Sequence, residues 1–125
     1  MIANVDADTF ILDQYYGNPP DPHGLYTASE LNLIRNAKPG KKRIILSYLS
    51  IGEAESYRPY WHASWDPGHT GDINSSNTPS WLLRHNPEWH GNYLVKYWNP
   101  HWQSLLMGFR AAPLDKIIAQ GFDGV

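Results

Sequence analysis

Short apolar runs alternate with helix-like segments along this chain. One run covers residues 9–13. A second, nearly continuous run covers 43–51, as expected for a strand of a parallel sheet that is covered on both faces. A third strand is predicted at 93–98, and the beginning of a fourth at Phe122.

The clearest helix signal follows the first apolar run. Thr27 and Glu30 match a capping box, in which each residue satisfies a backbone N–H of the other at the helix start. Pro39 and Gly40 end this helix, because proline cannot continue it and glycine favours its C-terminal turn.

Two more helices are predicted near the end of the chain. Asn99 and Pro100 supply an N-cap and a first-turn proline, and the residues that follow place four apolar side chains on one face: Trp102, Leu105, Leu106 and Phe109. Another helix covers 113–120 and is closed by Gly121. Between the second and third strands, a helical turn or two is predicted at 53–61 and a long loop at 65–81.

The order of these elements predicts an α/β fold with a parallel sheet. A (β/α)8 TIM barrel takes about 250 residues, so the chain would supply its first three strands and the start of the fourth. We therefore expect residues 1–125 to be the N-terminal half of a single barrel domain that is truncated at the C-terminus. A natural start upstream of Met1 stays open as an alternative.

Composition and charge exclude several classes of function. The formal charge is -2, which gives no basic surface for nucleic acid. The chain contains no cysteine, and its 6 histidines are scattered without a compact ligand pattern, so neither a metal nor another cofactor is expected. No apolar run reaches the eighteen or so residues of a membrane span.

Aromatic residues are the most unusual part of the composition. The chain has 6 Trp and 8 Tyr, concentrated between Tyr48 and Trp102. One explanation is packing, because these side chains bury a large area and keep a polar group for a hydrogen bond. The other is a sugar-binding cleft, in which aromatic faces stack on sugar rings. We expect four of the tryptophans to pack in loops: Trp61, Trp65, Trp81 and Trp89.

Candidate binding residues lie at the predicted strand ends. Active sites of (β/α) barrels form at the C-terminal ends of the strands, where Asp13, Glu53 and Trp98 are expected. The alternative for Asp13 is a cap of the following loop. Tyr48 is expected either to point into the barrel near the cleft or to be an ordinary core residue.

Other acidic residues are weaker candidates. Glu53 and Glu55 are two positions apart, so their side chains diverge and only Glu53 is expected to line the cleft. Glu55 is expected to pair with Arg58 on a surface turn. Asp123 begins a strand and would therefore lie at the bottom of the barrel, where such residues serve stability.

Several stretches together resemble glycoside hydrolase family 114, the endo-α-1,4-polygalactosaminidase-like proteins. The resemblance lies in residues 11–16, 45–61, 86–93, 97–98 and 121–125. It implies a TIM barrel, hydrolysis of α-1,4-linked galactosamine-containing polysaccharide, and a catalytic carboxylate directly after the last stretch. It also suggests a secreted or cell-envelope protein, although residues 1–6 lack the features of a signal peptide.

The main functional hypothesis is a polysaccharide-binding fragment of such a glycosidase, inactive as this chain. Five residues are expected to contact the sugar, with Glu53 also a supporting carboxylate: Asp13, Tyr15, Tyr48, Glu53 and Trp98. The alternative is a carbohydrate-binding or interaction module without chemistry, formed by one chain or by two half-barrels as a homodimer. The sequence does not fix the oligomeric state.

Overall fold

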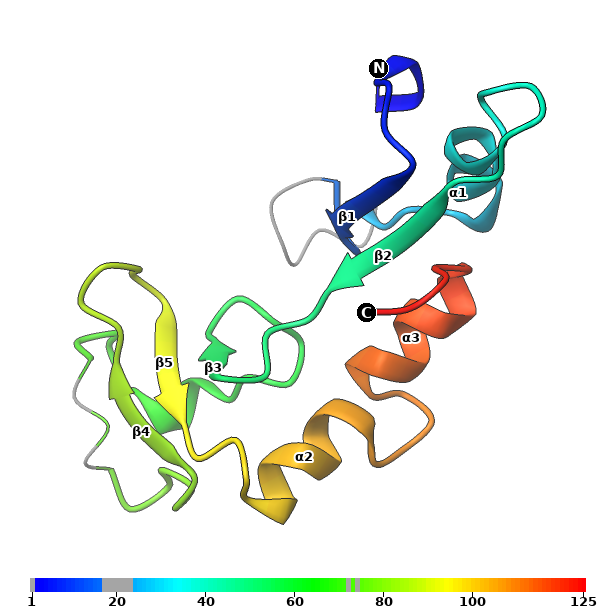
Figure 1. Cartoon of the computed structure of the whole chain (residues 1–125). Coiled ribbons are helices and arrows are strands. Elements are labelled where there is room, and N and C mark those ends of the chain that lie inside the picture. The colour runs from blue at the N-terminus through cyan, green and yellow to red at the C-terminus, as the bar shows by residue number, and fades with distance from the viewer. Residues whose placement is uncertain (1, 17–23, 72, 74) are drawn as a thin grey trace. The chain divides into compact units, whose positions relative to one another are not determined.

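The computed structural model describes residues 2–16, 24–71, 73 and 75–125. They form two compact units (Figure 1). The first unit combines Met1–Leu49 with Arg110–Val125, and the second is Ser50–Phe109. Helices and strands occur in both units, so the fold class is mixed α/β. All six tryptophans belong to the second unit.

A parallel pair of strands forms the centre of the first unit. β1 (Thr9–Asp13) lies beside β2 (Ile44–Tyr48), with Thr9 opposite Ile44 at one end and Asp13 opposite Tyr48 at the other. A short 3-10 helix, η1 (Ile2–Asn4), precedes β1. The predicted parallel pairing of the first two strands is confirmed.

The last residues of the chain add to this pair. Gly124 forms a parallel bridge with Leu46, and the backbone N–H of Ser47 donates to the carbonyl oxygen of Gly124 at 2.9 Å. The backbone N–H of Asp123 donates to the carbonyl oxygen of Ile45 at 2.8 Å. The chain after Phe122 therefore begins a strand, as predicted, and it is the third parallel element of this unit.

Two helices of the first unit follow the predicted signals. α1 (Ala28–Arg35) begins with the capping box, in which Thr27 Oγ1 accepts from the backbone N–H of Glu30 at 3.2 Å. α3 (Pro113–Gln120) ends at Gly121, whose φ of 96° is the left-handed conformation that glycine adopts without strain. Both helices are confirmed, but α1 ends at Arg35, before the predicted stop at Pro39 and Gly40.

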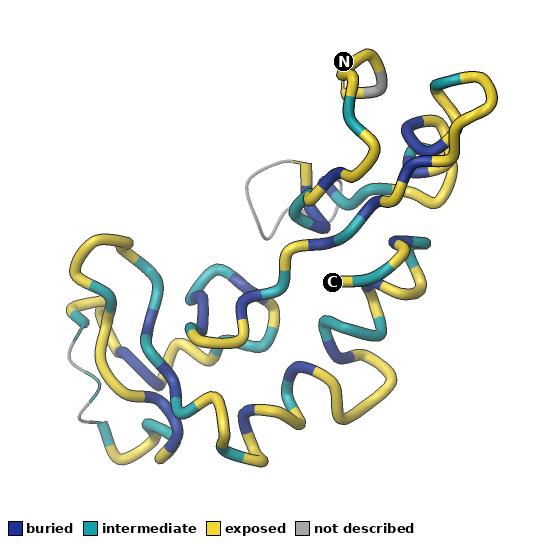
Figure 2. The backbone as a smooth tube through the Cα atoms, in the orientation of Figure 1, coloured by how far each residue is buried: buried dark blue, intermediate teal, exposed yellow. Residues whose placement is uncertain are grey.

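The core of the first unit is built from alternate strand positions and from both helices. Six side chains form it: Phe10, Leu31, Ile34, Ile45, Ile117 and Phe122. Between these positions Ile11, Ile44 and Tyr48 are exposed. Figure 2 shows buried and more exposed stretches alternating along both strands. The prediction that the second strand is covered on both faces is therefore wrong within the described residues, and this strand ends at Tyr48 rather than near Gly52.

The second unit contains an antiparallel sheet. β5 (Asn92–Val95) lies between β3 (Glu53–Glu55) and β4 (Leu82–His85) and runs antiparallel to both (Figure 1). α2 (Pro100–Met107) follows, and the Asn99 side chain caps its first turn as predicted. A 3-10 turn, η3 (Ala63–Trp65), lies between β3 and β4.

Two predictions for this segment are wrong. Residues 53–55 are a strand, not the helical turn expected there, because they pair with β5 and pairing between distant segments overrides a weak local preference. The strand predicted at 93–98 is β5, which ends at Val95 and is antiparallel. The described residues thus contain two parallel strands and the start of a third, not three and the start of a fourth.

Aromatic side chains form much of the core of the second unit. Trp65 packs edge-on against both Trp61 and Trp81, with ring centroids 5.1 Å apart in each pair. Trp81 in turn lies 4.9 Å from Trp102 of α2. Packing therefore explains much of the aromatic content, as predicted for Trp61, Trp65 and Trp81. The same prediction is wrong for Trp89, which is 68% exposed.

Candidate functional site

The predicted binding residues fall into two groups, one in each unit. Asp13, Tyr15 and Tyr48 belong to the first unit, and Glu53 and Trp98 to the second.

In the first unit, Asp13 and Tyr48 are neighbours. They are register partners at the carboxyl ends of β1 and β2, which places their side chains on the same face of the strand pair. Tyr48 is 49% exposed, so the core alternative for this residue is wrong. Asp13 Oδ1 accepts from the backbone N–H of Tyr15 at 3.1 Å, which is the loop cap considered as its alternative. The Tyr15 side chain itself is buried.

In the second unit, two amides hold the carboxylate of Glu53. Oε1 accepts from Asn86 Nδ2 at 2.8 Å, and Oε2 accepts from Asn92 Nδ2 at 2.7 Å. The Glu53 carboxylate is therefore fixed in orientation and only partly buried. Sequence reasoning missed both asparagines. The one signal for both was their place in the stretch 86–93 that resembles the family.

Glu55 has different partners from Glu53. Its carboxylate accepts from Arg58 Nε at 2.7 Å and from the Tyr57 hydroxyl at 2.6 Å. The predicted pairing with Arg58 is confirmed, but the predicted surface position is wrong, because both side chains are only 6% exposed. A buried carboxylate that is held by an arginine and a tyrosine serves structure, and losing one partner of such a pair is costly.

Trp98 forms an exposed aromatic pair with Tyr97. Their ring centroids are 5.0 Å apart and their planes are nearly perpendicular. Both rings are more than half exposed, and they lie in the turn between β5 and α2 rather than at a strand end as predicted. An exposed indole in a fixed turn can stack on an apolar face of a ligand.

Asp66 is a buried carboxylate that sequence reasoning did not single out. Its Oδ2 accepts from the Tyr93 hydroxyl at 2.5 Å and from the backbone N–H of Gly71 at 2.8 Å, and its Oδ1 accepts from the backbone N–H of Thr70 at 3.1 Å. Burial would raise the pKa of Asp66, but these hydrogen bonds outweigh it and hold the pKa below the ordinary value. Burial and the hydrogen bond to Asp66 raise the pKa of Tyr93 far above its usual range, so its hydroxyl stays protonated.

Asp123 is tied to the start of β2 and the end of α1. Its Oδ2 accepts from the backbone N–H of Ile45 at 2.8 Å and from Arg35 Nε and Nη2, each at 3.2 Å. These contacts are structural, in agreement with the reasoning that set Asp123 aside as a catalytic residue.

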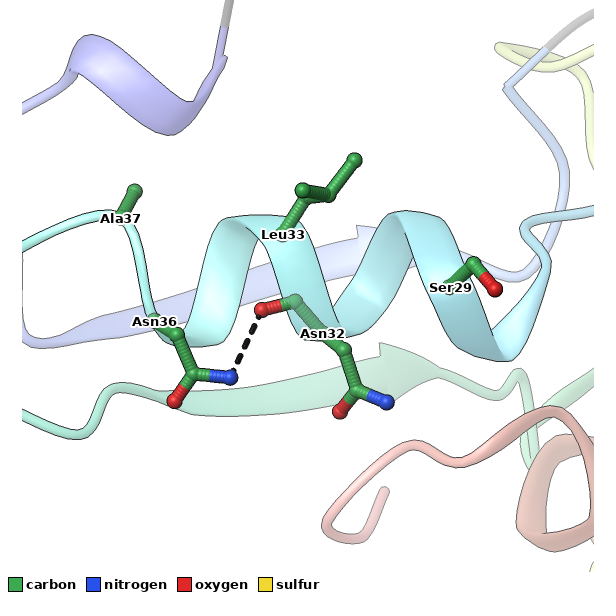
Figure 3. Close-up of a pocket in the computed structure, with 5 residues that line it drawn as sticks. All are labelled: Ser29, Asn32, Leu33, Asn36 and Ala37. Atoms are coloured by element: carbon green, nitrogen blue, oxygen red, sulfur yellow. Dashed lines mark hydrogen bonds between the residues drawn. The ribbon is translucent and has the colours of Figure 1, made fainter.

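One face of α1 lines a hollow of about 550 Å³ (Figure 3). The lining side chains are Ser29, Asn32, Leu33, Asn36 and Ala37. None of them is titratable, and in the close-up Leu33 points away from the helix. The hollow offers no group for acid-base chemistry, so we assign no catalysis to it.

The described part of the chain lacks two further features. No group of three or more His, Cys, Asp or Glu side chains there could hold a metal ion. No helix there is long and apolar enough to span a membrane.

Comparison with known proteins decides the family. The model of glycoside hydrolase family GH114 matches residues 25–125. The chain belongs to this family. The family resemblance seen in the sequence is confirmed. In general terms, the chain belongs to a domain of the glycoside hydrolase class.

Relatives of this GH114 chain extend well beyond it. An uncharacterized protein of Methanocaldococcus jannaschii is 40% identical over 99% of the chain and 30% of its own length. Uncharacterized proteins of Deinococcus radiodurans and Thermotoga maritima are 47% and 34% identical over 66% and 88% of the chain. The chain spans less than a third of the length of each of these three relatives.

Proposed function

We propose that this chain supplies part of the substrate-binding surface of a GH114 glycosidase that acts on α-1,4-linked galactosamine-containing polysaccharide. The observation that carries the proposal is the family match over residues 25–125. In this proposal the three parallel elements of the first unit belong to a (β/α)8 barrel. The position of Asp13 and Tyr48 at the carboxyl ends of β1 and β2 supports it, because barrel active sites form at that end.

Each unit by itself offers groups that an amino sugar requires. Protonated amines are attracted by carboxylates such as Asp13 and Glu53, and hydroxyl groups can bond to the same oxygens. The exposed ring of Trp98 provides an apolar face for the C–H side of a sugar. Glu53 acts here as a supporting carboxylate, which Asn86 and Asn92 hold in place.

The proposal assigns cleavage to groups outside these 125 residues. A glycosidase needs two carboxyl groups, about 5 to 10 Å apart, that flank the scissile bond. Two of the acids described above are occupied in the fold, since Glu55 is held by Arg58 and Asp66 by Tyr93. The family resemblance implies a catalytic carboxylate directly after 121–125. The chain alone is therefore expected to bind polysaccharide without cleaving it.

Binding is tested with the 125-residue chain and two variants, Trp98→Ala and Asp13→Asn. Each should weaken binding to a soluble galactosamine oligosaccharide about tenfold, which corresponds to roughly 1.4 kcal/mol for one stacking or charged contact. Phe109→Ala is the matched control, because Phe109 is also an exposed aromatic residue of the second unit. Calorimetric titration gives the affinities. If both site variants bound with wild-type affinity, Trp98 and Asp13 would not belong to the binding surface.

Cleavage is tested by measuring the release of reducing ends from a galactosamine polymer. The full-length Methanocaldococcus jannaschii relative should release them, and the 125-residue chain should not. Release by the chain itself would show that its own carboxylates catalyse. No release by the full-length relative would argue against the proposed substrate.

A carbohydrate-binding module without chemistry is the second candidate. The observation that favours it is that each unit has a core of its own. This candidate predicts a monodisperse monomer of 14.3 kDa or its half-barrel dimer, with cooperative thermal unfolding. Size-exclusion chromatography with thermal melting distinguishes it from a barrel part, which is expected to associate or to behave as a loose state.

A further inference from the structure

Three histidines of the second unit line one small pocket. The pocket has a volume of about 140 Å³, and its lining residues come from three segments: His69, Thr70, Gly71, His85, Asn86, Pro87, His90, Gly91 and Tyr93. His69 belongs to the turn that wraps Asp66, His85 ends β4, and His90 lies in the turn between β4 and β5. The sequence showed no ligand pattern in these residues because His69 lies 16 positions before His85 and the spacing of His85 and His90 matches no compact motif.

The walls of this histidine pocket are held by specific contacts. Gly71 is fixed by its hydrogen bond to Asp66 and approaches His85 so closely that a Cβ atom would lie 2.5 Å from His85 Nδ1. The Asn86 amide donates to Glu53, while its oxygen accepts from the backbone N–H of Glu88 at 2.9 Å. These contacts define the shape of the pocket before any ligand enters.

The three imidazole rings have no side-chain partner among the described residues. None of them makes a hydrogen bond or an ion pair with another side chain in the part of the chain that the structure describes. A neutral imidazole has one N–H donor and one acceptor nitrogen. Three such rings beside a fixed amide therefore present donors and acceptors together, which suits hydroxyl groups because each hydroxyl both donates and accepts.

Two other kinds of ligand fit this pocket less well. The imidazoles do not form a group that could hold a metal ion. An anion would be opposed by nearby carboxylates, since Asp66 bonds to Gly71 in the wall and Glu53 bonds to Asn86. Glu88, two residues after Asn86, adds a further negative charge to this turn.

We propose that the histidine pocket binds one hydroxyl-rich sugar ring of the polysaccharide, beside the Glu53 carboxylate. Asn86 connects the two, because it lines the pocket and donates to Glu53. Trp89 precedes His90 in the same turn and is exposed. This inference rests on the proposed polysaccharide function and adds a subsite to it.

The test follows the ring protons of each histidine by nuclear magnetic resonance, above neutral pH, where histidine side chains are in general uncharged. Galactosamine is titrated into the 125-residue chain, and inorganic phosphate into a second sample. We expect galactosamine to shift the signals of His69, His85 and His90, while those of His62 and His101, outside the pocket, stay in place. Phosphate should shift none of them.

Variants then separate binding from folding. His90→Ala should weaken galactosamine binding about tenfold, as expected for one lost hydrogen bond of roughly 1.4 kcal/mol, and His101→Ala should leave it unchanged. Unchanged pocket signals with galactosamine, or shifts with phosphate alone, would overturn the inference. Loss of oligosaccharide binding in Trp98→Ala is measured separately, so the proposed function can stand even if the histidine pocket stays empty.

Discussion

At the residue scale, the buried carboxylate of Asp66 is the most consequential single group. Asp66 is fully buried, and it accepts hydrogen bonds from the Tyr93 hydroxyl and from the backbone of Thr70 and Gly71. An unsatisfied buried carboxylate is far more costly than a missing hydrogen bond at the surface. The turn around Asp66 therefore depends on these donors, and so does the wall of the histidine pocket.

Tyr93→Phe should destabilise the second unit by about 1.5 to 3 kcal/mol, the usual worth of a hydrogen bond to a charged group. Urea unfolding followed by tryptophan fluorescence measures this effect, because all six tryptophans lie in the second unit. Tyr97→Phe is the matched control: Tyr97 is also a tyrosine of this unit, but it is 58% exposed. Equal unfolding midpoints for the two variants would contradict the role given to Asp66.

The same contact predicts a pH dependence. The pKa of Asp66 is lower in the folded state than its ordinary value of 3.8, so this carboxylate stabilises the fold above that pH. The stabilisation is lost as the pH falls through the lowered folded-state pKa. We therefore expect the difference between Tyr93→Phe and the wild type to be largest near neutral pH and to shrink in acid. Urea titrations from neutral pH down to about pH 3 would show it.

Sequence reasoning located some of these residues and missed others for a physical reason. Asp13 and Glu53 were found because each follows an apolar run, which is a local signal. Asn86 and Asn92 were missed because their bonds to Glu53 join positions 33 and 39 residues away. A contact between such distant positions leaves no periodic pattern along the chain. Asp66 was missed for the same reason, because its side-chain partner Tyr93 lies 27 residues away.

At the element scale, prediction was most accurate where the signal is local. The caps of α1 and α2 and the glycine after α3 are set by neighbouring residues, and all three were predicted. The errors lie at 43–51, 53–61 and 93–98, where pairing with and covering by distant segments decide the structure. An apolar run predicts a strand, but it does not tell whether the neighbouring strand is parallel or antiparallel.

The parallel elements of the first unit are joined through Asp123. Its Oδ2 bonds to Arg35 of α1 and to the backbone of Ile45 in β2, and the Arg35 side chain is 9% exposed. Asp123→Ala should cost about 2 kcal/mol, because it leaves a largely buried arginine without its charged partner. Asp123→Asn keeps an acceptor for Ile45 and should cost less.

Amide hydrogen exchange at Leu31 measures this effect within the first unit, which contains no tryptophan. The buried Leu31 N–H donates to the Thr27 carbonyl oxygen, so the substitution does not remove its own hydrogen-bond acceptor. A loss of about 2 kcal/mol corresponds to exchange roughly 30-fold faster where opening of the unit limits exchange. Asp6→Ala is the control, because Asp6 pairs with Lys38 on the surface and such pairs contribute little. If the two alanine variants exchanged at equal rates, the bonds of Asp123 to Arg35 and Ile45 would not stabilise the first unit.

At the scale of the whole molecule, the first unit exposes an apolar sheet face. Ile11, Ile44 and Tyr48 lie on the side of β1 and β2 that faces away from the core residues Phe10 and Ile45. Exposed apolar surface of this kind favours association or binding to another surface. In the proposed barrel the same face would point inward, which agrees with the place of Asp13 and Tyr48 at its carboxyl end.

This face predicts that the 125-residue chain associates with itself as its concentration rises. Ile11→Lys should reduce the association and lower the binding of a hydrophobic dye, because it places a charge in the middle of the face. Leu33→Lys is the matched control. Leu33 and Ile11 are both 70% exposed, but Leu33 lies on α1 and not on the sheet face. Size-exclusion chromatography over a range of concentrations compares the variants. If Leu33→Lys reduced association as strongly as Ile11→Lys, the association would come from general exposure of apolar side chains rather than from the sheet face.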